Sequence, residues 1–337
     1  MRLLRGRGSS LEFESDEDRR DLGVSDLPEE RWALILGGSS GFGLATARKL
    51  AEEGMNLFLV HRDRRGALRR IEPEFEKIRG LGVQLHTWNE DAISAEKRGA
   101  ILDEIEGLLG SRGRVRVLLH SIAFGNLKLL TRERPMPRSA GPALAARLGI
   151  AAETLREAAD ELFAAGEDGL HPLTSATVYS DRSFLDEEDF ARTILAMGTS
   201  LLGWTQGLFD RGLFAADARV FGLTSEGNTL AWKGYAAVSA AKASLEALAR
   251  SIAVEFGPHG IRCNVIQAGI TETPALAAIP GSDQLKAQAR LRNPLGRLTT
   301  PRDVANVIHL LSLDGAAWIN GDVIRVDGGE HVSGATR

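Results

Sequence analysis

Three side chains in the second half of the chain could carry proton-transfer chemistry. Tyr235 lies seven residues before Lys242 in the stretch GYAAVSAAK, and Ser225 lies seventeen residues before the same lysine. A phenol with an ordinary pKa of about 10 is a poor proton donor to a neutral oxygen but a good one to an enolate beside an ammonium group. On a helix, positions i−4 and i−7 lie on nearly the same side as residue i, with the second about 5 Å further along the axis. We therefore expect Tyr235, Lys242 and Ser225 to form one catalytic group.

A glycine-rich stretch, LILGGSSGFGLA, follows an apolar run and precedes a helical pattern. Glycines let the backbone turn tightly and approach a diphosphate, while the free N–H groups at the start of the following helix neutralise its charge. This context predicts a dinucleotide-binding loop. We expect it to consist of Gly37, Ser39, Ser40, Gly41, Phe42 and Gly43.

The same letters also fit the G-x-S-x-G elbow of serine hydrolases, through Gly37, Ser39 and Gly41. That elbow normally follows several strands and needs an acid and then a histidine downstream. Here the serine follows the first apolar run. Its position argues against a hydrolase.

Charged residues stand where the ribose and adenine of a dinucleotide would lie. The second apolar run ends in LVHRDRR, so Arg62 takes the place where a carboxylate would grip both ribose hydroxyls of NAD. An arginine there favours a 2′-phosphate, and Asp63 leaves NADH open. We expect NADPH as the preferred cofactor, with NADH possible, and Asp91 and Ala92 near the adenine.

Short apolar runs alternate with helical patterns over most of the chain, which predicts an α/β, Rossmann-type, doubly wound parallel sheet in a single domain. The runs are rich in Val, Ile and Leu and lack polar alternation, as strands covered on both faces do. They cover residues 32–38, 55–61, 83–88, 115–121, 218–224, 262–269 and 322–329.

Two segments depart from this alternation. Residues 1–30 are charged and are expected to form a disordered tail before a domain of residues 31–337. Residues 127–186 separate the fourth strand from the next helix, far more than an ordinary loop. An apolar stripe there predicts an amphipathic helix packed on the domain, in a helical insertion that serves as a lid, substrate cover or interface. The stripe consists of Leu144, Leu148, Leu155, Ala159, Leu162 and Phe163.

The bulk composition points to small-molecule partners. The formal net charge of −4 gives no steering toward nucleic acid or an anionic membrane, and no apolar stretch is long enough to span a bilayer. A lone cysteine, Cys263, cannot form an internal disulfide and sits in an apolar run, so we expect it to be buried. We expect a cytoplasmic protein, with no nucleic acid and no membrane among its partners.

The motifs together resemble a short-chain dehydrogenase/reductase over about residues 32–126 and 187–331. The resemblance is carried by Gly37, Gly41, Gly43, Ser225, Tyr235, Lys242, QAGITET and VDGG. In that family the tyrosine usually lies four residues before the lysine, where this chain has Val238. The longer spacing resembles the enoyl-acyl-carrier-protein reductases, as does HSIAF at 120–124. The enoyl reductase III branch is closer still, with a substrate loop similar to TPALAAIPGSDQLKAQAR.

The spacing also has a chemical reason. In ketone reduction, the oxygen that takes the proton is bonded to the carbon that takes hydride. In enoyl thioester reduction, hydride goes to the β-carbon and negative charge appears on an oxygen two carbons away. A donor moved by one helical turn suits this displaced charge. We therefore expect reduction of a trans-2-enoyl thioester, in fatty acid or related acyl-chain biosynthesis.

The resemblance implies further site residues and partners. Residues at the strand ends would line the cofactor cleft, namely Ser121, Ile122, Ala123, Gly269, Thr271 and Thr273, with the ribose held by Lys242. Phe124, Tyr235 and Leu276 are expected to meet the substrate. The family implies a homotetramer and an acyl thioester. An acidic acyl carrier protein could meet the insertion through Arg132, Arg134 and Arg138.

Two alternatives to enoyl reduction remain open. A carbonyl reductase of the same fold would use Tyr235 to protonate a ketone, but Met197 stands where many family members have an asparagine for a proton relay. A non-catalytic cofactor-binding scaffold is a second alternative. His120 is expected to be a packed strand-end residue. We expect no metal site, because no His or carboxylate pair has convincing ligand spacing.

Overall fold

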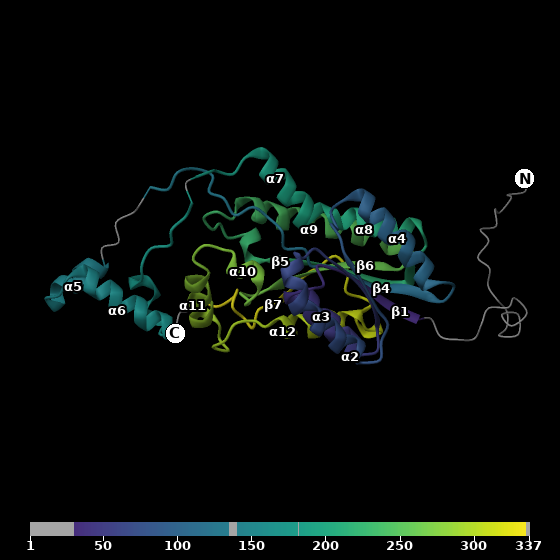
Figure 1. Ribbon diagram of the computed structural model, residues 1–337, viewed down its shortest axis with the longest axis horizontal. Helices are drawn as coiled ribbons and strands as arrows, with labels where there is room; N and C mark the ends of the chain where they lie inside the picture. The colour runs from purple at the N-terminus through teal and green to yellow at the C-terminus, as the bar shows by residue number, and fades with distance from the viewer. Residues whose placement is uncertain (1–29, 135–139, 181, 335–337) are drawn as a thin grey trace, which may run out of the picture.

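A parallel seven-stranded sheet forms the centre of the protein (Figure 1). The structure, a computed structural model, describes residues 30–134, 140–180 and 182–334. The strand order is β3-β2-β1-β4-β5-β6-β7, and every pairing is parallel. This confirms the predicted doubly wound fold. The strands are β1 Glu30–Leu36, β2 Asn56–His61, β3 Leu85–Asn89, β4 Gly113–His120, β5 Phe214–Ser225, β6 Ile261–Ala268 and β7 Val323–Val326.

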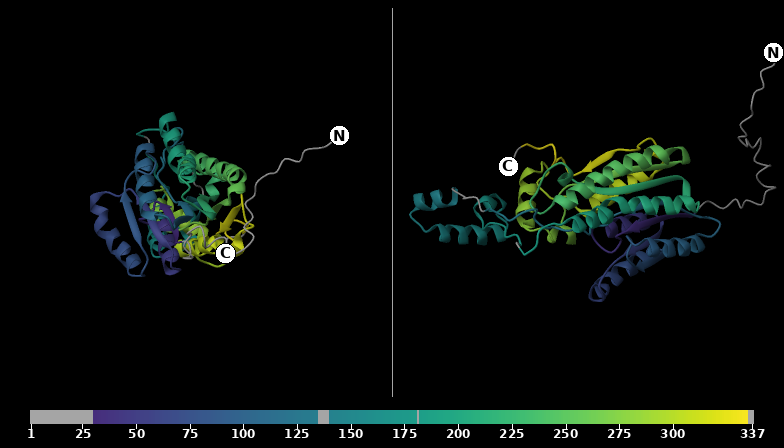
Figure 2. Two further views of the ribbon diagram at one scale, coloured as in Figure 1. Left: turned by 90° about the vertical axis from the view of Figure 1, so that its right-hand side faces the viewer. Right: turned by 90° about the horizontal axis from the view of Figure 1, so that it is seen from above.

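Helices cover both faces of the sheet (Figures 1 and 2). One face packs against α4 Ala95–Leu109, α8 Ser200–Asp210 and α9 Ala236–Glu255. The other packs against α2 Gly41–Glu52, α3 Arg65–Arg79 and α12 Pro301–Ser312. Because successive side chains of a strand point to opposite faces, Leu34 and Leu36 enter the first core and Ala33 and Ile35 the second. This is why the strands lack polar alternation.

The insertion is a helical hairpin that extends away from the sheet (Figures 1 and 2). It contains α5 Ala140–Leu148, α6 Ala152–Ala164 and the short 3₁₀ helix η1 Asp168–Leu173, and the main domain resumes with α7 Glu187–Ile194. The prediction that its apolar stripe packs on the domain is wrong. Leu148 is 57% exposed and Leu162 is 50% exposed, and Leu144 is exposed as well. The stripe is divided between two helices, of which only Ala145 and Ala159 are buried.

The two ends of the insertion lie side by side. The backbone N–H of Asn126 donates to Oγ1 of Thr193 at 3.0 Å, and the N–H of Leu185 donates to the carbonyl of Leu129 at 2.8 Å. These bonds close the long segment at its base.

Nearer the site, the insertion is joined to helix α11 Ser282–Arg292. Arg290 donates from Nε and one terminal nitrogen to the two carboxylate oxygens of Asp168, at 2.5 and 2.6 Å. Such a bidentate pair fixes orientation as well as distance. The base of the insertion is therefore attached to the segment that resembles a substrate loop.

The expected disordered tail falls, except for Glu30, outside the described residues, and Glu30 itself begins strand β1. Within the described ranges, no helix has the length and apolar character needed to cross a membrane.

Candidate active site

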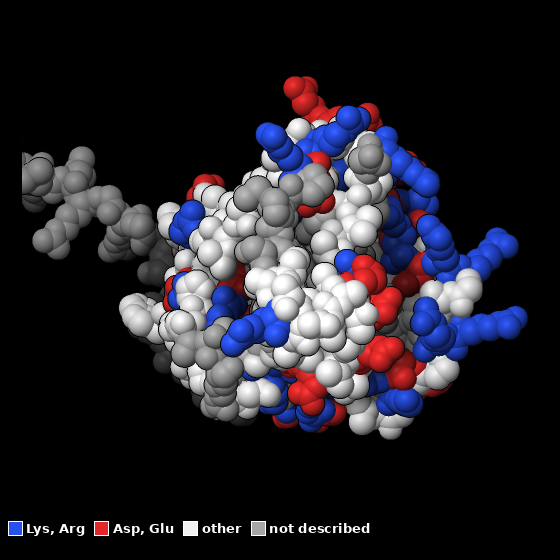
Figure 3. All heavy atoms as spheres, turned by 90° about the vertical axis from the view of Figure 1, so that its left-hand side faces the viewer, with Lys and Arg blue, Asp and Glu red and all other residues white. Residues whose placement is uncertain are grey.

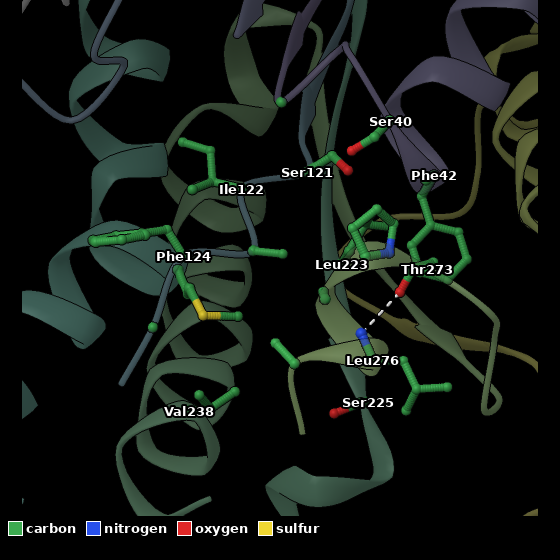
Figure 4. Close-up of a pocket in the computed structure, with 18 of the residues that line it drawn as sticks. Ser40, Phe42, Ser121, Ile122, Phe124, Leu223, Ser225, Val238, Thr273 and Leu276 are labelled. Carbon is green, nitrogen blue, oxygen red and sulfur yellow. Dashed lines mark hydrogen bonds between the residues drawn. The ribbon is translucent and has the colours of Figure 1, made fainter. Parts of the chain in front are cut away.

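A cavity of about 500 Å³ opens at the carboxyl ends of the central strands. It spans the point between β1 and β4 where the strand order reverses, which is where open α/β sheets bind ligands. Figure 4 shows Phe124 and Val238 on one side of this main cavity and Thr273 and Leu276 on the other. Thr273 caps the short helix α10 Pro274–Ala277, where its Oγ1 accepts the N–H of Leu276 at 3.2 Å.

The structure brings together almost all of the predicted site residues. The lining includes Gly37, Ser39, Ser40, Gly41, Phe42, Arg62, Asp91, Ala92, Ser121, Ile122, Ala123, Phe124, Ser225, Tyr235, Lys242, Gly269, Thr271, Thr273 and Leu276. Gly43 is the exception, because it is buried behind the loop. A Cβ there would lie 2.1 Å from the carbonyl oxygen of Gly37. Its place in the motif is explained by close packing of α2 against the loop, not by contact with a ligand.

The glycine-rich loop has the geometry of a diphosphate cradle. Gly37 has φ +86°, and a Cβ on it would lie 2.5 Å from the carbonyl oxygen of Ser121. Gly41 has φ +52° and begins α2, so the free N–H groups of that helix face the cavity. These residues fit a nicotinamide dinucleotide.

The three candidate catalytic residues reach the main cavity from two elements. Ser225 ends β5, and its Oγ lies 3.4 Å from the phenolic oxygen of Tyr235. Lys242 is buried on α9, two turns into the helix. Tyr235 is not inside that helix, as the sequence argument assumed, but is its N-cap residue, with φ −108° and ψ 2°. The Tyr235 phenol still lies at the N-terminal end of α9, the helix that carries Lys242.

Burial shifts the pKa values of both ionisable groups. It raises the pKa of the Tyr235 phenol, with the hydrogen bond to Ser225 acting in the opposite direction. It lowers the pKa of the Lys242 ammonium group to about 8, and the carboxylate of Glu246 partly offsets this. Within the described chain, the Lys242 amine makes no hydrogen bond. A buried amine without a partner is suited to hold a ribose hydroxyl.

Glu246 lies one helical turn after Lys242 and connects α9 to the end of β5. Its Oε1 accepts Oγ1–H of Thr224 and Nδ2–H of Asn228, each at 2.5 Å. Asn228 ends the 3₁₀ helix η3 Glu226–Asn228, which directly follows Ser225. Glu246 thus ties the elements that carry the lysine and the serine. The sequence analysis missed this residue, although an acidic residue four positions after the lysine was a visible signal.

One wall of the main cavity is apolar. Val238 and Met197 pack with Tyr235 in a small buried cluster, and Met197 belongs to the π-helical turn η2 Leu195–Thr199. Met197, which stands where many members of the family have an asparagine, therefore lines the main cavity with its thioether side chain. Further apolar lining residues, which the sequence analysis did not name, are Leu127, Trp232, Ile279 and Leu285.

Arginine and aromatic side chains meet at the far end of the main cavity. Arg62 pairs with Asp91 at 2.9 Å, and its guanidinium lies 4.5 Å from the ring centroid of Phe124. Phe124, which was expected to meet the substrate, therefore lies in the main cavity against Arg62. Asp63 is paired with Nδ1 of His61 at 2.8 Å. Basic side chains line the right-hand edge of Figure 3, on the side where α3 lies. Arg64, Arg65, Arg69 and Arg70, at the start of α3, are exposed.

His120 and Cys263 are both packed inside the fold. Nε2 of His120 lies 2.8 Å from Oγ of Ser200, and burial lowers the pKa of the imidazole to about 3. Burial raises the pKa of the Cys263 thiol, so it is inert. In the part of the chain that the structure describes, no group of three or more His, Cys, Asp or Glu could hold a metal ion.

Comparison with known proteins gives several relatives of full length. The chain is 26% identical to cis-4-hydroxycyclohexanecarboxylate dehydrogenase of Sinomonas cyclohexanicum, over 89% of this chain and 96% of the relative. It is 28% identical to a probable 2,4-dienoyl-CoA reductase of Bacillus subtilis (strain 168), over 90% and 97% of the two chains. Among solved structures, enoyl-(acyl-carrier-protein) reductase of Anaplasma phagocytophilum in complex with NAD has a TM-score of 0.65 at 19% identity, covering 92% and 95%.

Two family models match the chain. The short chain dehydrogenase model covers residues 31–132. The model described as enoyl-(acyl carrier protein) reductase covers residues 152–331, more than half of the 337 residues. The chain therefore belongs to the family of the second model, within the short-chain dehydrogenases/reductases, and is an NAD(P)-dependent oxidoreductase.

Proposed function

We propose that the protein is an enoyl reductase that acts on trans-2-enoyl thioesters of acyl carrier protein or coenzyme A. The observation that carries this proposal is the hydroxyl pair of Ser225 and Tyr235, 3.4 Å apart, with Tyr235 seven residues before Lys242. Val238, four residues before the lysine, lines the main cavity and offers no proton.

The residues divide the chemistry among them. Bound NAD(P)H supplies the hydride that is added to the β-carbon. Tyr235 and Ser225 donate hydrogen bonds to the thioester oxygen, and Tyr235 gives its proton to the enolate that forms there. The enol then tautomerises to the saturated thioester. The Lys242 cation stabilises the developing negative charge, an interaction strengthened by the burial of its amine.

The apolar wall serves the acyl chain. Leu127, Met197 and Val238 line the side of the main cavity beside Tyr235. An acyl chain placed against them leaves water, and the same contact excludes water from the proton donor.

We propose NADPH as the preferred cofactor, with NADH as the alternative. Arg62 is 45% exposed in its side chain, and its contacts in the described chain are the ion pair with Asp91 and the ring of Phe124, so its guanidinium can turn to a 2′-phosphate. Asp63 is occupied by His61, which makes it a weaker candidate for the ribose hydroxyls.

An acidic carrier protein is the proposed macromolecular partner. Arg132 and Arg134 are exposed at the start of the insertion, whereas Arg138 lies outside the described residues. Replacing Arg132 and Arg134 by serine is expected to raise the KM for a carrier-bound enoyl thioester, because rim charges steer encounter. The KM for the coenzyme A thioester is expected to stay the same. Equal effects on both substrates would contradict the carrier proposal.

We also propose self-association, as the family suggests through its homotetramers. Exposed apolar side chains gather at the end of α12 and beside it: Leu310, Leu313, Trp318, Ile319 and Val254. Trp318 is 98% exposed, and such a patch marks an association surface. Light scattering should find a tetramer for the parent and smaller species for Trp318→Ser. A monomeric parent would contradict this.

Carbonyl reduction is the second candidate function, because the Ser225–Tyr235 pair can also polarise a ketone and one relative is named cis-4-hydroxycyclohexanecarboxylate dehydrogenase. Crotonyl and acetoacetyl thioesters, each assayed with NADPH and with NADH, separate the two. Enoyl reduction predicts faster turnover of the crotonyl substrate. Turnover of the acetoacetyl substrate alone would replace the first proposal by the second, and cofactor binding without any turnover would leave a non-catalytic scaffold.

A further inference from the structure

A second cavity of about 620 Å³ lies beside the main cavity. Its walls come from four segments: residues 140–141 at the start of α5, residues 171–179 at the base of the insertion, residues 231–233 just before Tyr235, and residues 279–288 of the substrate loop and α11. The second cavity therefore exists only because the insertion returns to the domain next to the substrate loop.

The two cavities share part of their walls. Trp232, Ile279 and Leu285 line both. The Trp232 ring meets the Tyr235 ring edge to face, with centroids 5.2 Å apart. A molecule whose carbonyl group lies at Tyr235 can therefore extend past Trp232 into the second cavity.

The second cavity has a mixed lining. Apolar atoms make up most of it, as in the main cavity, but polar side chains also reach it, among them Thr177, Tyr179, Gln284 and Gln288. The amides of Gln284 and Gln288 make no hydrogen bond to any described residue. A primary amide offers both donors and an acceptor, the complement of another amide. Gln284 is half-buried and Gln288 is exposed, so water reaches both amides. An apolar acyl chain laid over them would displace that water without replacing its hydrogen bonds, whereas an amide-bearing ligand would replace them.

The walls of the second cavity are held in place. The bidentate pair of Arg290 with Asp168 fixes α11 to η1. Gly281 packs so closely on the insertion that a Cβ there would lie 2.6 Å from Oγ1 of Thr177. A site held on both sides loses little entropy when a ligand binds.

We propose that the second cavity binds the pantetheine arm of the thioester substrate, with the two amides of that arm paired to Gln284 and Gln288. The inference rests on the proposed function. It divides the substrate between the cavities: the acyl chain lies against the apolar wall of the main cavity, and the arm passes Trp232 into the second.

The test compares two thioesters of the same acyl group. Crotonyl-pantetheine carries the whole arm, and crotonyl-N-acetylcysteamine carries only the amide nearest the sulfur. Thr177→Trp fills the second cavity, and its matched control is Val178→Trp, since Val178 is 87% exposed and lines neither cavity. A double variant, Gln284→Leu with Gln288→Leu, removes the amides without adding bulk.

Thr177→Trp should raise the KM for crotonyl-pantetheine about tenfold or more and leave that for crotonyl-N-acetylcysteamine within about twofold. The double variant should raise the first KM about fivefold for each lost hydrogen bond. Val178→Trp should change neither. Equal changes with both thioesters, or none with either, would overturn the proposal.

Two further substrate pairs identify the occupant and its source. An effect of Thr177→Trp on KM that grows with the length of the acyl group, and not with the presence of the pantetheine arm, would mean that the acyl tail occupies the second cavity, against the proposal. Crotonyl-coenzyme A and the crotonyl carrier protein share the arm and should respond alike, whereas a rise confined to coenzyme A would point to its nucleotide and overturn the assignment. The parent's turnover of crotonyl-N-acetylcysteamine tests the enoyl reductase proposal separately, because that substrate lacks most of the arm.

Discussion

Gly227 lies against the ring of Tyr235, so that a Cβ added to it would stand 2.5 Å from Cε1 of the phenol. No real Cβ contact is that short, and the tyrosine would have to move. Gly227 belongs to η3, which follows Ser225 directly. The backbone after the serine thus sets the position of the tyrosine hydroxyl.

Gly227→Ala is therefore expected to displace the phenol and to lower kcat for crotonyl thioester about a hundredfold, as small misplacements of reacting groups do. Steady-state kinetics measures this. The matched control is Gly107→Ala in α4, where no atom lies within 4 Å of the added Cβ. That variant should keep full activity and gain about 0.5–1 kcal/mol of stability. An active Gly227→Ala enzyme would show that the ring is not held from this side.

The pH dependence of catalysis should follow Lys242. Burial lowers the pKa of its ammonium group to about 8, and Glu246 acts against this. The cation is present below that pH, so kcat/KM should fall as pH rises through about 8. His120, which also faces the lysine, is neutral throughout because burial lowers its pKa to about 3.

Glu246→Gln keeps an acceptor for Thr224 and Asn228 but removes the charge that raises the Lys242 pKa. The alkaline limb of the kcat/KM profile should therefore move to lower pH. Glu255→Gln, an exposed change on the same helix, should leave it in place. An unmoved limb in Glu246→Gln would mean that another group controls it.

Stability at acid pH should depend on Asp217, which lies near the start of strand β5. Burial raises the pKa of this carboxyl, but hydrogen bonds from Arg219 and Arg116 outweigh it and hold the pKa at about 2. Because the folded pKa lies below the unfolded one, the stabilisation is complete above about pH 4 and is lost as pH falls toward 2. Asp217→Asn leaves the buried guanidinium of Arg219 without a carboxylate and that of Arg116 with only the exposed Asp314, and it should cost about 3 kcal/mol in urea unfolding at pH 7.

Asp303 provides the comparison for that experiment. Its pKa is also about 2, mainly through the hydrogen bond from Arg297, but that arginine is more than half exposed. Asp303→Asn keeps an acceptor for the Thr300 N–H but loses the pair with Arg297 and the negative charge in the first turn of α12, and it should cost about 1 kcal/mol. Equal costs for the two variants would show that burial of the arginines contributes nothing.

Arg62→Ser tests cofactor preference. Loss of a charge-assisted contact to a 2′-phosphate should raise the KM for NADPH about 10- to 100-fold. The KM for NADH should change by less than about twofold. An equal rise for both cofactors would show that Arg62 binds a part they share, and a larger effect of Asp63→Ala on NADH would favour the alternative cofactor.

The sequence was sufficient for the sheet and most of the site because both depend on local signals. Buried parallel strands appear as unbroken apolar runs, and the glycine loop, Ser225, Tyr235 and Lys242 each occupy strand or helix ends that those runs define. The carboxyl ends of parallel strands meet at one edge, so residues far apart in sequence line one cavity. The predicted doubly wound parallel sheet was confirmed because its strands follow these local signals.

The insertion was harder to predict, since its stripe of leucines has the pattern of a helix packed on a core. Gly149 has φ +70° and separates two short helices, which the pattern alone could not place relative to the sheet. The contacts that do fix the insertion are polar and distant in sequence, as in Arg290 with Asp168. Glu246 was missed for the same reason, because its partners lie on another element.

The bonds that join Asn126 to Thr193 and Leu129 to Leu185 give the insertion a common exit and entry. Closing a long loop costs little more than closing a short one, so evolution can lengthen, trim or exchange this stretch without rerouting the sheet. Grafting the corresponding segments of homologues onto this domain would be a practical route to new reductases. These enzymes would share one hydride-transfer machinery and differ in the molecules they accept.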